Sequence, residues 1–170
     1  MTSDAERLSL LFDTHEDKLY RLARRLTRSA EEAEDLIQDT FLKAAGTLGA
    51  IPEGTSKEEA WLVRVLINTC RDDWREAAVR RRAAPLVLAM TPDAPSNAES
   101  ALIAKRTVWT ALDALRPRRR AIVILSELEG LGPDAIASLL GVAVVTVRWH
   151  LSMGRRDLRR ALASHMGENT

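Results

Sequence analysis

The stretch 131–162 carries the densest set of side chains suited to binding a nucleic acid. Pro133 favours the start of a first short helix, and Gly141 favours its end. A second helix then has an apolar stripe on one side and a basic face on the other. The apolar stripe comprises Val147, Leu151, Leu158 and Leu162, and the outer face comprises Trp149, Ser152, Met153, Arg156, Arg159 and Arg160. Two helices joined by a tight glycine turn, the second with a basic outer face, are typical of a helix-turn-helix whose second helix enters the DNA major groove. An ordinary helical hairpin with a solvated basic face is the alternative.

A second basic stripe lies on the helix predicted from Trp61 to about Arg82. Its inner face is apolar and comprises Val63, Leu66, Ile67, Cys70, Trp74 and Ala77. Its outer face comprises Trp61, Arg64, Asn68, Arg71, Arg75 and Arg82. Cations bind phosphate, whereas planar groups and an amide can contact bases, so this stripe favours single-stranded nucleic acid as a ligand. A solvated surface is the alternative here too.

An acidic face is predicted on the helix that follows Ser29. Ser29 and Glu32 have the spacing of a capping box, as do Ser3 and Glu6 before the first helix, which is predicted to run to about Thr27. The inner face of the second helix comprises Ala33, Leu36, Ile37, Thr40, Phe41 and Ala44. Its other sides carry Glu31, Glu34, Asp35, Gln38 and Asp39. Carboxylates repel phosphate, so this face is expected to bind a protein partner, with simple solvation as an equal alternative.

The composition excludes several classes of protein. The chain has 170 residues, is 46% hydrophobic and contains only 8 Gly and 6 Pro, which is typical of a helical protein. The net charge of +1 means that any affinity for a polyanion must come from local patches. No long apolar run and no signal-peptide core are present, which predicts a cytoplasmic protein without membrane insertion.

Chemistry-bearing residues are sparse. A single cysteine, Cys70, excludes an internal disulfide and a cysteine-rich zinc site, and His15 is expected to pack rather than to bind a metal. We find no phosphate-binding glycine loop, no metalloprotease motif and no plausible nucleophilic triad. We therefore expect no enzymatic activity, no metal and no cofactor.

The segment 83–98 separates two groups of predicted helices. It contains three of the six prolines and no helical periodicity, so it is predicted to be a flexible linker. The expected fold is all-α, with two small helical domains at 1–82 and 99–170, the second containing the helix-turn-helix.

Within the second domain, a helix capped by Ser96 and Glu99 is expected to bury Leu102, Val108, Trp109, Leu112 and Leu115. A helix from Arg118 to Glu129 is expected to bury Ile122, Leu125 and Leu128. The segment 46–59 is predicted to be irregular, and the tail after Ser164 to be frayed.

Two parts of the sequence together resemble the extracytoplasmic-function group of bacterial sigma factors. The segment AEDLIQDTFLKA at 33–44 is similar to the region 2 helix that docks on the clamp helices of the RNA polymerase beta-prime subunit. The segment WLVRVLINTCRDDWREAAVRRR at 61–82 resembles the pattern W-L-x-x-I-x-x-N-x-x-x-D-x-x-R that engages the melted minus-ten element. The segments SELEGLGPDAIASLLGV and TVRWHL resemble region 4, which reads the minus-thirty-five element.

The resemblance implies a sigma factor that binds RNA polymerase core and directs it to specific promoters. Its implied partners are polymerase core and promoter DNA, with an anti-sigma factor as a further partner, because sequestration by one is common in the resembled family. The implied polymerase-binding residues are Asp35, Leu36, Gln38, Asp39 and Phe41. The implied minus-ten residues are Trp61, Arg64, Asn68, Arg71 and Arg75, and the implied minus-thirty-five residues are Thr146, Arg148, Trp149, Ser152, Arg155 and Arg156.

Two alternatives remain at this point. One is a polymerase-independent helix-turn-helix regulator, since TVRWHL also resembles the recognition helix of response-regulator output domains. The other is a helical adaptor that binds only protein. The first leaves the 33–44 segment unexplained, and the two arginine stripes weigh against the second.

Overall fold

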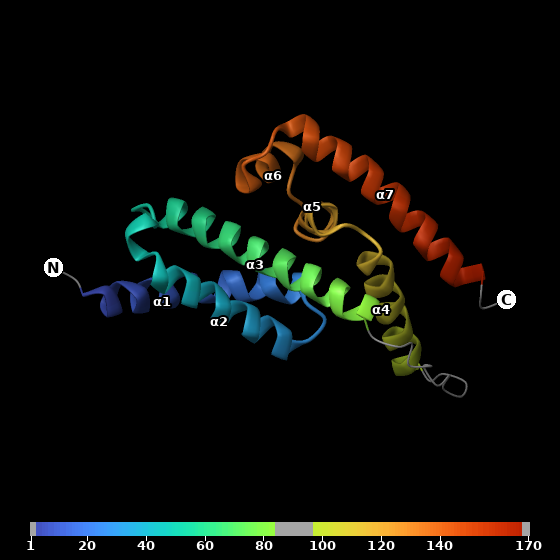
Figure 1. The fold of residues 1–170 in the computed structure, drawn as a ribbon, viewed down its shortest axis with the longest axis horizontal. Helices are drawn as coiled ribbons and strands as arrows, with labels where there is room; N and C mark the ends of the chain where they lie inside the picture. Colours follow the sequence, from blue (N-terminus) through green and yellow to red (C-terminus); the bar gives the residue numbers. More distant parts are fainter. Residues whose placement is uncertain (1–2, 84–96, 168–170) are drawn as a thin grey trace.

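The computed structural model describes residues 3–83 and 97–167, which form seven α-helices, one short 3₁₀ helix and no strand (Figure 1). The elements are α1 (Asp4–Leu26), α2 (Ala30–Gly46), η1 (Leu48–Ala50), α3 (Thr55–Ala83), α4 (Asn97–Asp113), α5 (Pro117–Glu127), α6 (Pro133–Leu140) and α7 (Val144–Gly167). The predicted all-α class is confirmed. The predicted linker lies outside the described residues, except that Ala83 ends α3 and Asn97 begins α4.

The N-terminal half, α1 to α3, is a three-helix unit in which each helix packs against the other two. The predicted capping box of α1 is present: Glu6 N–H donates to Ser3 Oγ, and Ser3 N–H donates to the Glu6 carboxylate. Ser29 caps α2 in the same way, but the Glu32 carboxylate accepts from Arg28 N–H instead. All six residues predicted to face inward on α2 are buried.

Helix α3 begins at Thr55, so the prediction that the chain stays irregular to residue 59 is wrong. Gly54, with φ of 104°, turns the chain, and its carbonyl accepts from the N–H groups of Lys57 and Glu58 at 2.9 Å each.

His15 is only 2% exposed and lies 3.4 Å from Glu58, as expected for a packing residue. Cys70 is buried, and burial raises the pKa of its thiol to about 12.

The C-terminal half, α4 to α7, is built around α5, whose residues 120–125 are all buried. Pro117 is the first residue of α5 and so starts the helix. Gly141 ends α6 in the left-handed conformation, with φ of 65°, and α7 leaves at an angle of 113° to α6. The predicted helix-turn-helix is therefore present, and α7 stays helical beyond Ser164 to Gly167.

Three residues expected in the core of this half are exposed instead: Leu102, Val108 and Leu128. On α4 the buried residues lie near its C-terminal end, at Ala111 and Leu112, and Leu115 follows in the turn to α5. Leu128 follows the last turn of α5, where the chain leaves the core. Helical spacing alone does not reveal where a neighbouring helix stops covering an apolar stripe.

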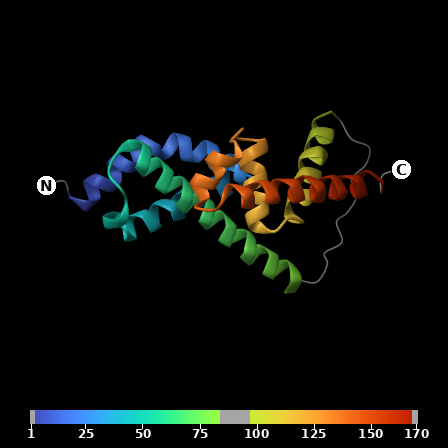
Figure 2. The same cartoon turned by 90° about the horizontal axis from the view of Figure 1, so that it is seen from above.

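The two halves contact each other through α5 and α6, which pack against α3, with a smaller contact between α5 and α1. In Figure 1, α5 lies between α3 and α7, and in the perpendicular view of Figure 2 α6 and the beginning of α7 overlap α3. This contact determines which surfaces of α3 are open to a ligand.

Candidate protein and nucleic-acid interfaces

The outer face of α2 is acidic and exposed. Asp35, Gln38 and Asp39 lie on the surface, whereas Leu36 and Phe41 are only 2% and 7% exposed. The Phe41 ring packs at 4.9 Å from the ring of Phe12 on α1. Two of the five residues predicted to bind polymerase therefore lie in the core, where they support the helix but do not present a contact surface.

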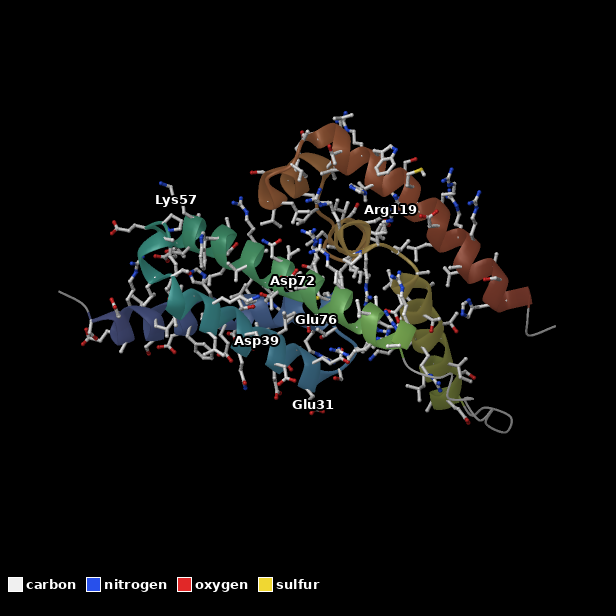
Figure 3. The ribbon with its side chains drawn as sticks, in the orientation of Figure 1. Glu31, Asp39, Lys57, Asp72, Glu76 and Arg119 are labelled. Carbon is white, nitrogen blue, oxygen red and sulfur yellow. The ribbon has the colours of Figure 1, made fainter. Side chains whose placement is uncertain are left out.

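The acidic surface continues from α2 onto α3. Figure 3 shows Asp39 on α2, and Asp72 and Glu76 on α3. The pKa of Asp73 is raised by burial and by the negative charges of Asp39 and Glu76, with Lys43 opposing them. Several carboxylates thus share one region of negative potential, which suits a basic protein surface and disfavours DNA phosphate.

The predicted minus-ten residues of α3, here called the α3 stripe, are Trp61, Arg64, Asn68, Arg71 and Arg75. Arg64, Asn68 and Arg75 are exposed, and Trp61 and Arg71 are partly buried. Arg71 donates to the Asn68 side-chain oxygen at 3.3 Å, and Arg75 donates to Asp72 at 3.2 Å. The α3 stripe is therefore one continuous face of a single helix.

Arg64 differs from the rest of the α3 stripe because it bonds to the other half of the molecule. Its Nε donates to the carbonyl oxygen of Leu139 at 2.8 Å, and its Nη2 donates to that of Ser138 at 3.2 Å. Both carbonyls belong to the last turn of α6.

Arg71 on α3 lies near Arg118 of α5 and His150 of α7. Its pKa is lowered by burial and by the positive charges of Arg118 and Arg75. The pKa of His150 is lowered by burial and then by Arg119, Arg118 and Arg71. Within the described part of the chain, Arg71 Nε and His150 Nδ1 are buried without a hydrogen-bond partner. The positive charges at this contact of α3 with α5 and α7 thus belong to arginines, and they disfavour the protonated form of His150.

The predicted minus-thirty-five residues lie on α7, the second helix of the helix-turn-helix. Arg148, Trp149, Ser152, Arg155 and Arg156 are exposed, and Thr146 is partly buried. Arg148, Ser152 and Arg155 line a shallow cavity of about 400 Å³, together with Arg159, Leu151, Ser126 and Pro133. Arg155 also donates to Glu127 at 2.7 Å. One face of α7, from Arg148 to Arg159, therefore presents cations and a hydroxyl.

Two arginines of α5 were missed by sequence reasoning. Arg119 bonds Asp157 on α7 at 2.5 Å, and its guanidinium lies 5.2 Å from the Trp149 ring centroid (Figure 3). Arg120 is 3% exposed and donates to Asp113 at 2.7 Å. No local signal in the sequence marked them, because the basic run 118–120 predicts surface.

Neither a metal site nor a membrane span is found in the described ranges 3–83 and 97–167. They contain no group of three or more His, Cys, Asp or Glu side chains placed to hold a metal ion. No single described helix is long and apolar enough to cross a bilayer; only α6 and α7 taken together meet the length and composition criterion, as a pair bent by 113°.

Comparison with known proteins gives consistent matches. Two protein-family models match, Sigma-70 region 2 over residues 11–80 and Sigma-70 region 4 over residues 105–158. The ECF RNA polymerase sigma factor SigE of Mycolicibacterium smegmatis is 37% identical over 91% of this chain, which spans 61% of that relative's length. SigL of Mycobacterium tuberculosis, also an ECF RNA polymerase sigma factor, is 32% identical over 94% of this chain and 91% of its own length.

A solved structure shares the fold. The sigma factor RpoE of Bartonella quintana, determined in complex with the anti-sigma factor NepR, matches with a TM-score of 0.55 and 22% identity. The match covers 94% of this chain and 96% of that one.

Proposed function

Because the chain belongs to the sigma-70 family, in the extracytoplasmic-function group of RNA polymerase sigma factors, we propose that it binds polymerase core and directs it to specific promoters. The proposed domains are residues 1–82 and 99–170, joined by 83–98. The region 2 and region 4 matches, 11–80 and 105–158, fall one within each proposed domain.

One observation carries the proposal: the exposed acidic residues of α2 lie on a different helix from the arginines of α3 and α7, and the acidic surface adjoins the α3 stripe at Asp72, which accepts from Arg75. Asp35, Gln38 and Asp39 are proposed to contact the beta-prime clamp helices, while buried Leu36 and Phe41 hold α2 in place. An acidic face complements a basic protein surface, and placing it on a different helix from the DNA-binding arginines limits repulsion of phosphate.

The nucleic-acid roles divide between the two halves. We propose that the α3 stripe holds the opened minus-ten strand, with the Asn68 amide available to a base edge. The exposed residues of α7 from Arg148 to Arg156 are proposed to contact the minus-thirty-five duplex. Thr146 is partly buried and lies in the first turn of that helix, and we propose that it contributes to the same contact.

The remaining assignments follow from this role. Sigma factors as a class are not enzymes, and we propose no catalytic activity for this chain. We propose action in the cytoplasm, because bacterial promoter DNA lies there. An anti-sigma factor is proposed as a further partner, since the Bartonella quintana sigma factor is bound to one.

The alternative of a polymerase-independent regulator is not favoured, since it leaves the region 2 match without a role.

Titration of labelled polymerase core with the full chain tests the proposal. Asp35→Arg should weaken core binding by about 30-fold, because a like-charge contact costs about 2 kcal/mol or more. Asp13→Arg, the same charge change at an exposed site on α1, is the matched control and should bind core like the wild type. Far-UV circular dichroism checks that both variants are folded. If Asp35→Arg binds core as tightly as the control, the proposed docking face is wrong.

A further inference from the structure

Two large apolar side chains lie on the outer face of α7, opposite the side that packs against the rest of the molecule. Val145 is 73% exposed and Trp149 is 53% exposed, whereas Val147 between them is buried. Each lies two residues from Val147, which places it about 200° around the helix from that residue. Val145 and Trp149 are therefore one helical turn apart on the same outer face, and a partner that buries them gains the hydrophobic effect.

The side chains around Val145 and Trp149 indicate which kind of partner buries them. Arg148, Ser152 and Arg155 lie to one side and line the shallow cavity, and Arg156 is exposed further along the helix. Cations at these positions favour phosphate. Because the start of the second helix of a helix-turn-helix enters the major groove, the apolar side chains face the base edges while the cations face the backbone.

Base pairs place one apolar group in the major groove, the C5-methyl group of thymine. Val145 forms no side-chain hydrogen bond, and the Trp149 indole offers only one donor, so neither suits the donor and acceptor edges of the other bases. The two residues are separated by about 6 Å along the helix axis, at a rise of about 1.5 Å per residue. This separation is between one and two base-pair steps of about 3.4 Å each, so the two side chains can reach methyl groups on neighbouring base pairs.

Arg119 of α5 holds the Trp149 ring from the protein side. Its guanidinium lies 5.2 Å from the ring centroid and donates to Asp157 of α7 at 2.5 Å, and Figure 3 labels it between the two helices. The Arg119 side chain is only 13% exposed. A cation against an aromatic face is attractive, and the attraction increases when the cation is removed from water. The ring is therefore ordered before DNA binds, which lowers the entropic cost of binding.

We propose that Val145 and Trp149 read thymine in the minus-thirty-five duplex by apolar contact with its C5-methyl groups, and that Arg119 is a positioning residue for Trp149. The inference rests on the proposed function, in which α7 contacts that duplex. It is independent of a base contact by Arg148, because a methyl group and a hydrogen-bonding edge are separate features of a base pair.

Deoxyuridine provides the test, because it lacks the methyl group of thymidine and keeps every hydrogen-bonding group of the base. The preferred duplex is first selected with polymerase core and the full chain from a promoter library randomised across the minus-thirty-five element. Each thymine of the selected element is then replaced singly by deoxyuridine. At one or two thymines, on neighbouring base pairs, the replacement should weaken binding about fourfold, as expected for one buried methyl-sized group.

Variants of the chain assign each deoxyuridine penalty to a side chain. Val145→Ala should lose most of the penalty at one thymine, and Trp149→Ala should lose it at the neighbouring one, because the methyl group has already lost its partner. Val79→Ala, at a site on α3 that is 64% exposed, is the control and should keep every penalty. Circular dichroism checks that all variants are folded. If no thymine shows a penalty, or if both test variants keep the penalties of the wild type, the methyl reading is wrong.

Arg119→Met tests the positioning role, because it removes the cation and keeps an unbranched apolar side chain. It should reduce the penalty at the thymine assigned to Trp149 and leave the penalty assigned to Val145 unchanged. A merely structural role would instead weaken binding to thymine and deoxyuridine duplexes alike. Arg119→Lys keeps the charge and should restore the penalty. If Arg119→Met keeps the full penalty at both thymines, Arg119 does not position the ring.

Titration with polymerase core separates failure of this inference from failure of the proposed function. If the chain binds core and no thymine shows a penalty, the function stands and the methyl reading is wrong. If the chain does not bind core, the proposed function is wrong, and the selection is repeated with the full chain alone. Deoxyuridine penalties that the two test variants remove then support the methyl reading, and their absence overturns it.

Discussion

The guanidinium of Arg120 lies 4.0 Å from the ring centroid of Trp74, so a cation of the C-terminal half is buried against α3 of the N-terminal half. Arg120 is 3% exposed, and its partners are Asp113 and the ring of Trp109 at 5.2 Å. Burial lowers the pKa of Arg120, and the Asp113 charge opposes that shift. A buried charge is tolerated only with such compensation.

Replacing Arg120 by Met should lower the free energy of unfolding by about 2 to 3 kcal/mol, because removing one member of a buried ion pair leaves the other poorly compensated. Arg28 and Arg81 remain beside Asp113 and limit the loss. The free energy of unfolding is measured by urea titration with circular dichroism as the signal. Arg118→Met, at an exposed site on the same helix, is the control and should change stability by less than about 0.5 kcal/mol. Equal stability of the two variants would contradict the role given to Arg120.

Acid should weaken the same cluster. Burial tends to raise the pKa of Asp113, but the hydrogen bond from Arg28 and the charges of Arg120, Arg28 and Arg81 outweigh it, so that the pKa lies below its ordinary value of 3.8. A depressed pKa stabilises the fold above the ordinary value, and that stabilisation is lost as pH falls through the depressed one. The urea midpoint should therefore decrease below about pH 4, and Asp113→Asn should show less of this decrease. An identical pH dependence in the variant would argue against the cluster.

Gly154 lies where α7 packs directly against Val123 and Arg119 of α5. A Cβ atom there would lie 2.5 Å from Val123 Cγ2 and 3.1 Å from Arg119 Cγ, so α7 cannot accept a methyl group without a shift. Gly154→Ala should cost about 1 to 3 kcal/mol, as overpacking of a core does. Gly46→Ala is the control, because its Cβ would meet nothing within 4 Å. Thermal unfolding compares the stability of the two variants. If Gly154→Ala is as stable as Gly46→Ala, the predicted clash of α7 with α5 is wrong.

The elements that local chemistry determines were predictable from the sequence. Pro133 and Gly141 set the limits of α6 because one fixes a helix start and the other adopts the left-handed conformation, and both predictions are confirmed. The early start of α3 was missed, although Thr55 and Glu58 repeat the spacing that correctly identified the caps at Ser3 and Ser29.

Features that depend on tertiary contacts were not predictable in the same way. Arg120 sits in the charged run 116–120, which predicts surface, and only the partners brought by α3 and α4 permit its burial. Leu102 and Val108 have helical spacing, yet no packed neighbour covers them in the described structure. The contact of Arg64 with α6 joins residues 74 and 75 positions apart, which no local pattern indicates.

The last prediction separates base reading from phosphate binding on α7. Arg148 lies in the first turns of the helix and lines the shallow cavity with Ser152 and Arg155, whereas Arg156 is exposed two turns later. Residues at the start of a recognition helix contact base edges, and later cations contact phosphate. Arg148→Ala should therefore cost about 1 to 3 kcal/mol and relax sequence preference, as loss of a bidentate base contact does.

Arg156→Ala is the matched comparison, because it removes the same charge from the same helix. It should weaken binding to all sequences alike and reduce the salt slope by about one unit, since a phosphate contact releases a counterion whatever the base. Holoenzyme binding to a panel of minus-thirty-five variants across a salt series measures both effects. If Arg148→Ala keeps the full sequence preference and loses only salt dependence, Arg148 binds phosphate, and base reading must come from other residues of the exposed face of α7.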